Sequence, residues 1–448
     1  MLRRKIDDYI SKFYAESDKA LLVTGARQVG KSFSIRNYGK NNYKCYVEVN
    51  FLEKPLAKKI FENAMDAKDV LMQLSALYGK PLVKGDTFMF FDEVQECPEV
   101  ITALKFLVEE GSYRYALSGS LLGVELNDFR SAPVGSMDIV EMFPLDFEEF
   151  VRAIGVNDDV LEHLRSAWER RVPVDDFIHH RMMNFFRIYL VTGGMPQVVN
   201  KYLETNDLSV VKRVQRAILN TYKLDISKYD KSEKLKINEI FDLIPVELSA
   251  KNKRFILKNL NENAKFTHYE DSFLWLKNSG VALPVYNVEE PKLPLLLARS
   301  CNLFKLFQND MGLLASQYAG NIQLMIINGD NSLNCGAIYE NAVAQELRAH
   351  GYALYYFNNK KQGEVDFVIE HNNHVVPIEV KSGKDYNRHR ALNNIMDNKV
   401  YDLPEAFVLT NDNLSVEGRI IYAPIYMTMF LQPKQENPLI YKPDLSGL

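Results

Sequence analysis

One stretch of eight residues constrains the fold of this chain more than any other part of it: Gly25-Ala26-Arg27-Gln28-Val29-Gly30-Lys31-Ser32. It fills every fixed position of the pattern G-x-x-x-x-G-K-[ST] and follows the apolar run Leu21-Leu22-Val23, which predicts a strand. Between a strand and a helix, the two glycines let the backbone turn so that successive N–H groups point at phosphate oxygens. We therefore expect residues 25–32 to bind a nucleotide, with Lys31 on the β- and γ-phosphates and Ser32 on a magnesium ion.

A pair of carboxylates, Asp92 and Glu93, follows the apolar run of residues 88–91. We expect Asp92 to hold the magnesium ion through water and Glu93 to act as the general base that polarises the attacking water. This pairing favours an ATPase over a GTPase. Asp92 lies 61 residues after Lys31, an interval that fits two strand-helix units of a doubly wound sheet.

The composition is that of an ordinary globular protein, with 47% apolar and 25% charged residues in a chain of 448. The net charge of −4 gives no overall attraction to nucleic acid, and the four cysteines lack the spacing of a zinc site or a disulfide framework. Neither a signal peptide nor a membrane-spanning stretch is recognisable. We expect a cytoplasmic protein of several domains without membrane contact.

Strand-like and helix-like segments alternate from residue 20 to residue 145, which predicts an open, mainly parallel sheet covered on both faces. One of these strands ends in Ser118-Gly119-Ser120, and a fifth strand is expected over residues 137–142. Ser118 or Ser120 could sense the γ-phosphate and orient the attacking water. Both could equally belong to a serine-rich turn.

Four segments, in this order along the chain, together resemble the prokaryotic AAA-type ATPase family that carries a C-terminal domain of unknown function: residues 25–32, Asp92-Glu93-Val94-Gln95, residues 143–150 and Gly193-Gly194-Met195-Pro196. ATP and Mg²⁺ are the expected cofactors, and a homo-oligomer is left open. The family often has a Gly-Arg pair before the fifth strand, where this chain has Gly135-Ser136. Arg130 is then the nearest candidate for an arginine that contacts the γ-phosphate of a neighbouring subunit.

The segment after residue 150 is expected to be mostly helical and to form a lid beside the nucleotide. Between Lys212 and Lys258, Lys and Arg outnumber Asp and Glu two to one, so a basic patch there could follow the backbone of DNA.

Three short helices and a strand are predicted next, with helices at 235–244, 252–260 and 269–278 and a break at Pro245. This order suggests a winged-helix module, as the resemblance also implies. The third helix begins Tyr269-Glu270-Asp271 and has a single cation, Lys277, so we favour a protein-facing or intramolecular role over base reading.

A second α/β unit follows residue 291. Glu340 lies on an expected amphipathic helix at 337–350, and Asp366 precedes Glu379-Val380-Lys381 by one turn at Asn372-Asn373. Glu379 and Lys381 share a strand face, so Asp366 and Glu379 could hold a divalent metal while Lys381 orients or deprotonates a water. This pattern resembles the restriction-endonuclease-like family, but a surface hairpin with a cross-strand salt bridge would look the same.

We thus expect an α/β multidomain protein with an AAA-type P-loop domain (1–150), a helical lid (151–232), a winged-helix-like module (233–290) and a restriction-endonuclease-like domain (291–448). The sequence favours an Mg²⁺-dependent ATPase that acts on or binds nucleic acid, with Glu340, Asp366 and Glu379 as metal ligands. The alternative is an ATP-gated protein-interaction switch whose nuclease-like fold is catalytically silent.

Overall fold

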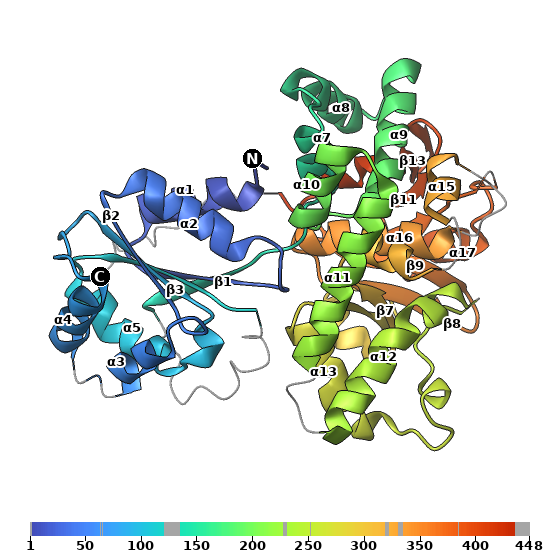
Figure 1. Ribbon diagram of the computed structural model, residues 1–448. Helices are drawn as coiled ribbons and strands as arrows, with labels where there is room; N and C mark the ends of the chain where they lie inside the picture. Colours follow the sequence, from blue (N-terminus) through green and yellow to red (C-terminus); the bar gives the residue numbers. More distant parts are fainter. Residues whose placement is uncertain are drawn as a thin grey trace, which may run out of the picture.

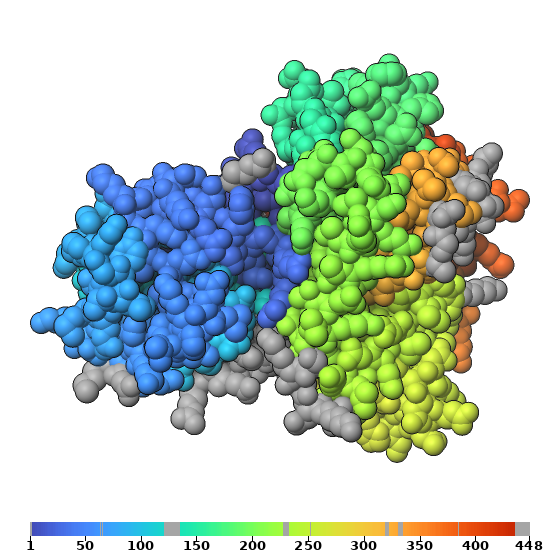
Figure 2. Space-filling model, in the orientation of Figure 1, coloured from blue at the N-terminus to red at the C-terminus, as the bar shows by residue number. Residues whose placement is uncertain are grey.

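The computed structural model describes the chain except residues 1, 63, 65, 121–134, 227–230, 251, 319–321, 330–334, 384 and 435–448. The described part has two halves, one built on a five-stranded sheet and one in which helices pack on an eight-stranded sheet (Figure 1). Figure 2 shows the N-terminal half, in blue, lying beside the green helices of the middle of the chain.

The N-terminal half is a parallel sheet covered by helices on both faces. Its strands are β1 (Ala20–Thr24), β2 (Cys45–Asn50), β3 (Thr87–Asp92), β4 (Arg114–Ser118) and β5 (Met137–Glu141), in the order β2-β3-β4-β1-β5. Its helices are α1 (Lys5–Glu16), α2 (Lys31–Asn42), α3 (Lys58–Glu62), α4 (Ala67–Tyr78) and α5 (Glu99–Glu110). Leu21 and Val23 of β1 face the core shared with α1 and α2, whereas Leu22 faces the core shared with α3 to α5. Because side chains alternate along a strand, this double coverage makes β1 apolar throughout, and the expected parallel α/β sheet is confirmed.

The middle of the chain is helical. It contains α7 (Phe147–Ala153), α8 (Asp158–Arg170), α9 (Asp176–Thr192), α10 (Pro196–Thr205), α11 (Leu208–Ile226), α12 (Lys231–Ser249) and α13 (Glu270–Asn278). Two of the helices expected as a lid contact the C-terminal half, since Trp168 of α8 stacks on Phe407 and His179 of α9 hydrogen-bonds to Tyr426. Helix α11 packs on α14 (Met311–Gln317) of the C-terminal half, and Asn309 donates a hydrogen bond to the hydroxyl of its Tyr222. The same helix also reaches the nucleotide-binding pattern.

The helix boundaries expected around Pro245 were wrong. Helix α12 runs through Pro245 to Ser249 because Ile240, Phe241, Ile244 and Leu248 bury one continuous apolar stripe on both sides of the proline.

No helix spans residues 252–260, where the structure has a single 3₁₀ turn, Leu257–Asn259. The backbone N–H of Phe255 instead donates to the carbonyl of Phe304, and the two rings stack. Tertiary packing therefore overrides the helical spacing of this segment.

The C-terminal half is a mixed sheet in the order β12-β13-β11-β10-β9-β8-β6-β7. Its strands are β6 (Ala282–Val288), β7 (Arg299–Gln308), β8 (Tyr355–Asn359), β9 (Gly363–His371), β10 (His374–Val380), β11 (Ala406–Thr410), β12 (Ser415–Glu417) and β13 (Ile420–Pro424). Its helices are α14 (Met311–Gln317), α15 (Ile322–Ile327), α16 (Gly336–Ala349), α17 (Arg390–Met396) and the 3₁₀ helix η7 (Ile425–Phe430).

Strand β6 pairs with β7 on one side and with β8 on the other. The domain boundary expected at residue 290 therefore falls between two neighbouring strands of one sheet. The strand expected in the winged-helix module is β6, and the hairpin that β6 forms with β7 belongs to the C-terminal sheet.

The helix expected at 337–350 is confirmed as α16, but it is buried on all sides from Ala337 to Leu347 and is therefore not amphipathic. It lies between the C-terminal sheet and α9, and its polar residues Glu340, Asn341, Gln345 and Glu346 are all buried. Buried polar side chains need partners, and those of α16 contact separate parts of the chain.

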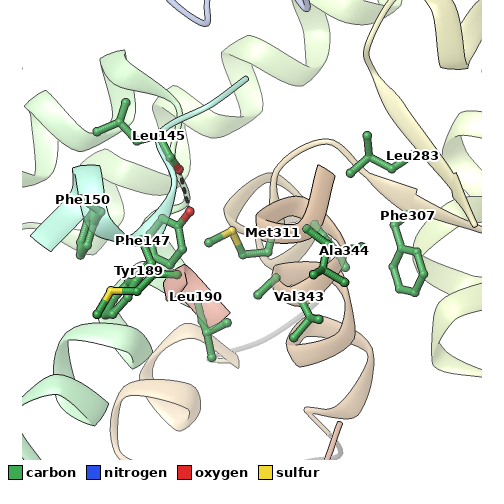
Figure 3. Close-up of a cluster of buried hydrophobic side chains, with 14 of the residues drawn as sticks. Leu145, Phe147, Phe150, Tyr189, Leu190, Leu283, Phe307, Met311, Val343 and Ala344 are labelled. Atoms are coloured by element: carbon green, nitrogen blue, oxygen red, sulfur yellow. Dashed lines mark hydrogen bonds between the residues drawn. The ribbon is translucent and has the colours of Figure 1, made fainter. Parts of the chain in front are cut away.

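The segment that follows β5 joins the two halves through a common core (Figure 3). Tyr189 of α9 donates a hydrogen bond to the carbonyl of Leu145 at 2.6 Å, and Phe147 packs against the same ring. The backbone N–H of Phe147 donates to Glu346 of α16 at 2.8 Å. One hydrophobic cluster consequently runs from α1 through α9 and α16 to the C-terminal sheet.

Among the described residues, no helix combines the length and the hydrophobicity that crossing a membrane requires.

Candidate functional site

The loop between β1 and α2 has the backbone of a phosphate cradle. Gly25, Gln28 and Gly30 have φ angles of 127°, 67° and 106°. A Cβ on Gly25 would lie 2.2 Å from the carbonyl oxygen of Met142, so only glycine fits there. Helix α2 begins at Lys31 and directs its N-terminus into the loop, as the sequence pattern predicted.

Lys31 is folded into this loop and is buried. Its Nζ donates to the carbonyl oxygens of Gly25 at 2.9 Å and Ala26 at 2.8 Å. Burial lowers the pKa of Lys31 to about 8, against the opposing effect of Glu93 and Asp92. Among the described residues, the ammonium group inside the cradle donates to carbonyl oxygens alone.

Asp92, at the end of β3, is the centre of a hydrogen-bond network. Ser32 Oγ donates to its Oδ1 at 3.0 Å, and Ser118 Oγ donates to the same oxygen. Asn50 Nδ2 donates to its Oδ2 at 3.1 Å. Asn50, Asp92 and Ser118 end three neighbouring strands in register, which is why the parallel sheet brings them together. The sequence analysis missed Asn50, although its place at the end of an expected strand was a usable signal.

Glu93 follows this network in a left-handed conformation, with φ of 56°. Gln95 Nε2 donates to Glu93 Oε2 at 2.5 Å and fixes the carboxylate beside Asp92. A non-glycine residue rarely adopts this backbone conformation, so its presence at a strand end marks a constrained position.

The two serines expected as phosphate sensors have different partners. Ser118 contacts Asp92, whereas Ser120 Oγ accepts a hydrogen bond from Nε of Arg27 at 3.4 Å. Ser118 therefore belongs to the network around Asp92, and Ser120 belongs to the rim of the cradle. Arg130, the candidate for contact with a neighbouring subunit, lies outside the described residues.

Helix α11 contacts the phosphate cradle directly. Nε of Arg27 forms an ion pair with Asp225 Oδ2 at 2.8 Å, and the hydroxyl of Tyr222 lies 3.4 Å from the carbonyl oxygen of Arg27. From the other side, Arg4 Nη1 donates to the carbonyl of Val29 at 2.9 Å. Residues distant in sequence thus hold both ends of the cradle, and neither Arg4 nor Tyr222 carried a sequence signal.

A cleft of about 360 Å³ separates the cradle from the C-terminal half. Gly25 and Ala26 line this cleft together with the cations Lys277, Arg299 and Arg348. Glu141 also lines it and pairs with Arg348 at 2.5 Å. Burial, with Arg299 and Arg348 nearby, lowers the pKa of Lys277. Lys277 and Arg299 add positive charge beside the Arg348–Glu141 pair, which favours an anionic ligand.

The basic segment expected to contact DNA is partly neutralised within the protein. Lys223 pairs with Asp242 at 2.5 Å, Lys236 pairs with Glu233 at 2.6 Å, and Lys253 pairs with Glu340. These three cations are therefore not free to follow a phosphate backbone.

The four residues expected in the C-terminal site do converge. The backbone N–H of Val380 donates to Asp366 Oδ2 at 2.9 Å, and Lys381 Nζ lies 2.7 Å from Glu379 Oε1. Burial, then the charge of Asp366, raises the pKa of Glu379 to about 8. Burial and Asp366 also raise the pKa of Glu340.

Another cation, Lys305 of β7, lies among these carboxylates. The sequence analysis missed it, although a lysine inside the apolar strand Leu303-Phe304-Lys305-Leu306-Phe307 is unusual. In the part of the chain that the structure describes, no three His, Cys, Asp or Glu side chains gather closely enough to hold a metal ion.

Three parts of the chain match known families. Residues 17–151 match an AAA domain, residues 183–322 match a domain of unknown function (DUF8612), and residues 335–427 match a second domain of unknown function (DUF4143). None of the curated proteins matches the sequence.

Several solved structures are similar to the chain at low identity. A Walker-type ATPase of Pyrococcus abyssi is 15% identical with a TM-score of 0.41, over 71% of this chain and 96% of the other. The ORC1 protein of Aeropyrum pernix, solved in complex with DNA, is 11% identical with a TM-score of 0.29, over 74% and 93%. RuvB of Thermotoga maritima is 12% identical with a TM-score of 0.28, over 62% and 87%. Since these TM-scores are low, the AAA-type P-loop domain rests on the AAA match and on the geometry of residues 25–32.

Proposed function

We propose that this protein is an Mg²⁺-dependent ATPase whose nucleotide state is passed to its C-terminal half. The observation that carries the proposal is the set of contacts that α11 makes with the phosphate cradle, through Asp225 and Tyr222 to Arg27. A nucleotide that binds in the cradle must fit beside the contacts that Arg27 makes with α11. Binding and the position of α11 are then linked.

The residues of the cradle fit a nucleotide with magnesium. Lys31 is buried with only two carbonyl acceptors, which phosphate oxygens can replace. Ser32 and Asp92 present the hydroxyl and carboxylate oxygens that Mg²⁺ prefers, and bound Mg²⁺ would neutralise charge on the phosphates. Glu93, oriented by Gln95, accepts a proton from the attacking water.

The test uses two substitutions in the full chain. Lys31→Ala should abolish ATP binding, and Glu93→Gln should bind ATP but hydrolyse it slowly. Hydrogen exchange of Glu93→Gln with and without ATP should then show changed protection in α11. Unchanged exchange in α11 with ATP bound would contradict the switch while leaving the ATPase intact.

A second candidate function is nucleic-acid binding in the cationic cleft. Lys277 of α13 and Arg299 of β7 face one cleft beside the cradle, which favours a phosphate backbone, whereas Arg348 in the same cleft pairs with Glu141. Fluorescence anisotropy with single-stranded and duplex DNA tests whether the cleft binds nucleic acid. Arg299→Glu should lower the affinity for DNA and make the affinity less dependent on salt. Arg213→Glu, an exposed cation of α11, is the matched control. Equal effects of the two substitutions would argue against the cleft.

A further inference from the structure

Seven charged side chains gather on the C-terminal sheet and α16. Four are carboxylates and three are ammonium groups: Glu340, Glu364, Asp366 and Glu379, with Lys253, Lys305 and Lys381. They come from β7, α16, β9, β10 and the segments that follow α12 and β10, and α16 carries the most buried carboxylate, Glu340.

Lys305 lies at the middle of this cluster. Its side chain is 0% exposed, and its Nζ lies 2.8 Å from Glu364, 3.7 Å from Glu340 and 3.8 Å from Asp366. The ring of Tyr356 covers another side of the ammonium group, 5.1 Å away. A fully buried ammonium requires such a set of carboxylates.

Each carboxylate that a divalent metal would need already has one partner, while Oε2 of Glu340 and Oε2 of Glu379 are buried without a hydrogen-bond partner among the described residues. Lys253 contacts Glu340, Lys381 contacts Glu379, and the backbone N–H of Val380 contacts Asp366. With three ammonium groups against four carboxylates, the cluster is close to neutral before any ion binds. A divalent cation would have to approach Lys305 against like-charge repulsion, so these residues do not fit a metal centre.

We infer that Lys305 is the resident cation of this cluster and takes the place of a divalent metal. The cluster then acts as a set of ion pairs that holds α16 and the segment after α12 on the C-terminal sheet. This gives the cluster a structural role in place of metal-dependent cleavage. The inference is independent of the proposed ATPase, because the phosphate cradle is formed by other residues.

The test measures Mn²⁺ binding to the full chain without nucleotide, by electron paramagnetic resonance. Wild-type protein and Glu379→Gln should bind the same amount of Mn²⁺, because no Mn²⁺ binds at the cluster of the wild-type protein. Lys305→Met, which keeps the length of the side chain but removes its charge, should bind Mn²⁺, and Glu379→Gln should abolish that binding in the double variant. The melting temperature of Lys305→Met without metal should fall by roughly 5 °C or more, because a buried charge cluster has lost one partner.

Two results would overturn the inference. Wild-type protein that binds Mn²⁺ at a site removed by Glu379→Gln would show that Lys305 does not exclude a metal. A folded Lys305→Met variant that still binds no Mn²⁺ would show that Lys305 is not the residue that excludes a metal ion. If Lys305→Met does not fold, the comparison of Mn²⁺ binding by wild-type protein and by Glu379→Gln still tests the inference.

Discussion

Replacing Glu346 with glutamine is expected to stabilise the protein at pH 8 and to change its stability much less at pH 5. Glu346 is buried in α16, and burial, then the charge of Asp146, raises its pKa from 4.5 to about 7 against the opposing effect of His350. Between pH 4.5 and pH 7 the folded protein keeps a proton that the unfolded chain has released. The stabilising effect of that proton is therefore complete below pH 4.5 and is lost as the pH rises through 7.

The shift corresponds to roughly 3 kcal/mol of unfolding free energy in the wild-type protein. Glutamine does not titrate, yet its Oε1 can still accept the hydrogen bond from the Phe147 N–H, at 2.8 Å in the wild type. The free energy of unfolding of Glu346→Gln should then vary less between pH 5 and pH 8 than that of the wild type, by about 2 kcal/mol.

Urea denaturation of both proteins at the two pH values measures this difference. Glu346→Ala is the control, because it removes the acceptor as well as the charge and should destabilise the protein at both pH values. A difference between wild type and Glu346→Gln that is the same at pH 5 and pH 8 would refute the reasoning.

The other predictions concern the phosphate cradle and the C-terminal cluster. Lys31→Ala should bind ATP at least about 100-fold more weakly with an unchanged circular dichroism spectrum, and unchanged affinity in calorimetry would contradict its role. Glu93→Gln should bind ATP normally but turn it over at least about 100-fold more slowly, and normal turnover would place the base elsewhere. Gly25→Ala should lose ATP binding and stability, since its Cβ would lie 2.2 Å from the carbonyl of Met142. Asp366→Asn should leave the rate of ATP hydrolysis unchanged, and a large fall would connect the two sites.

The phosphate cradle and the parallel sheet were predictable because their signals are local. The pattern at residues 25–32 fixes the loop, and apolar runs mark the strands around it. The partners Arg4 and Tyr222 were not predictable in the same way, since they reach the cradle through contacts between segments far apart in sequence. The helix break expected at Pro245 was wrong for a related reason. Burial of the apolar stripe on both sides of the proline stabilises the helix by more than the lost backbone hydrogen bond costs.

The core shared by the two halves has a consequence for how such a chain can be divided. Cutting it after residue 150 would uncover Phe147 and Phe150, which are both 0% exposed, and would deprive Tyr189 of the carbonyl of Leu145. Either fragment expressed alone should aggregate, since it would present a large apolar patch to water. Recombination that replaces one half with that of another protein would expose the same apolar surface. The two halves are therefore expected to be inherited together.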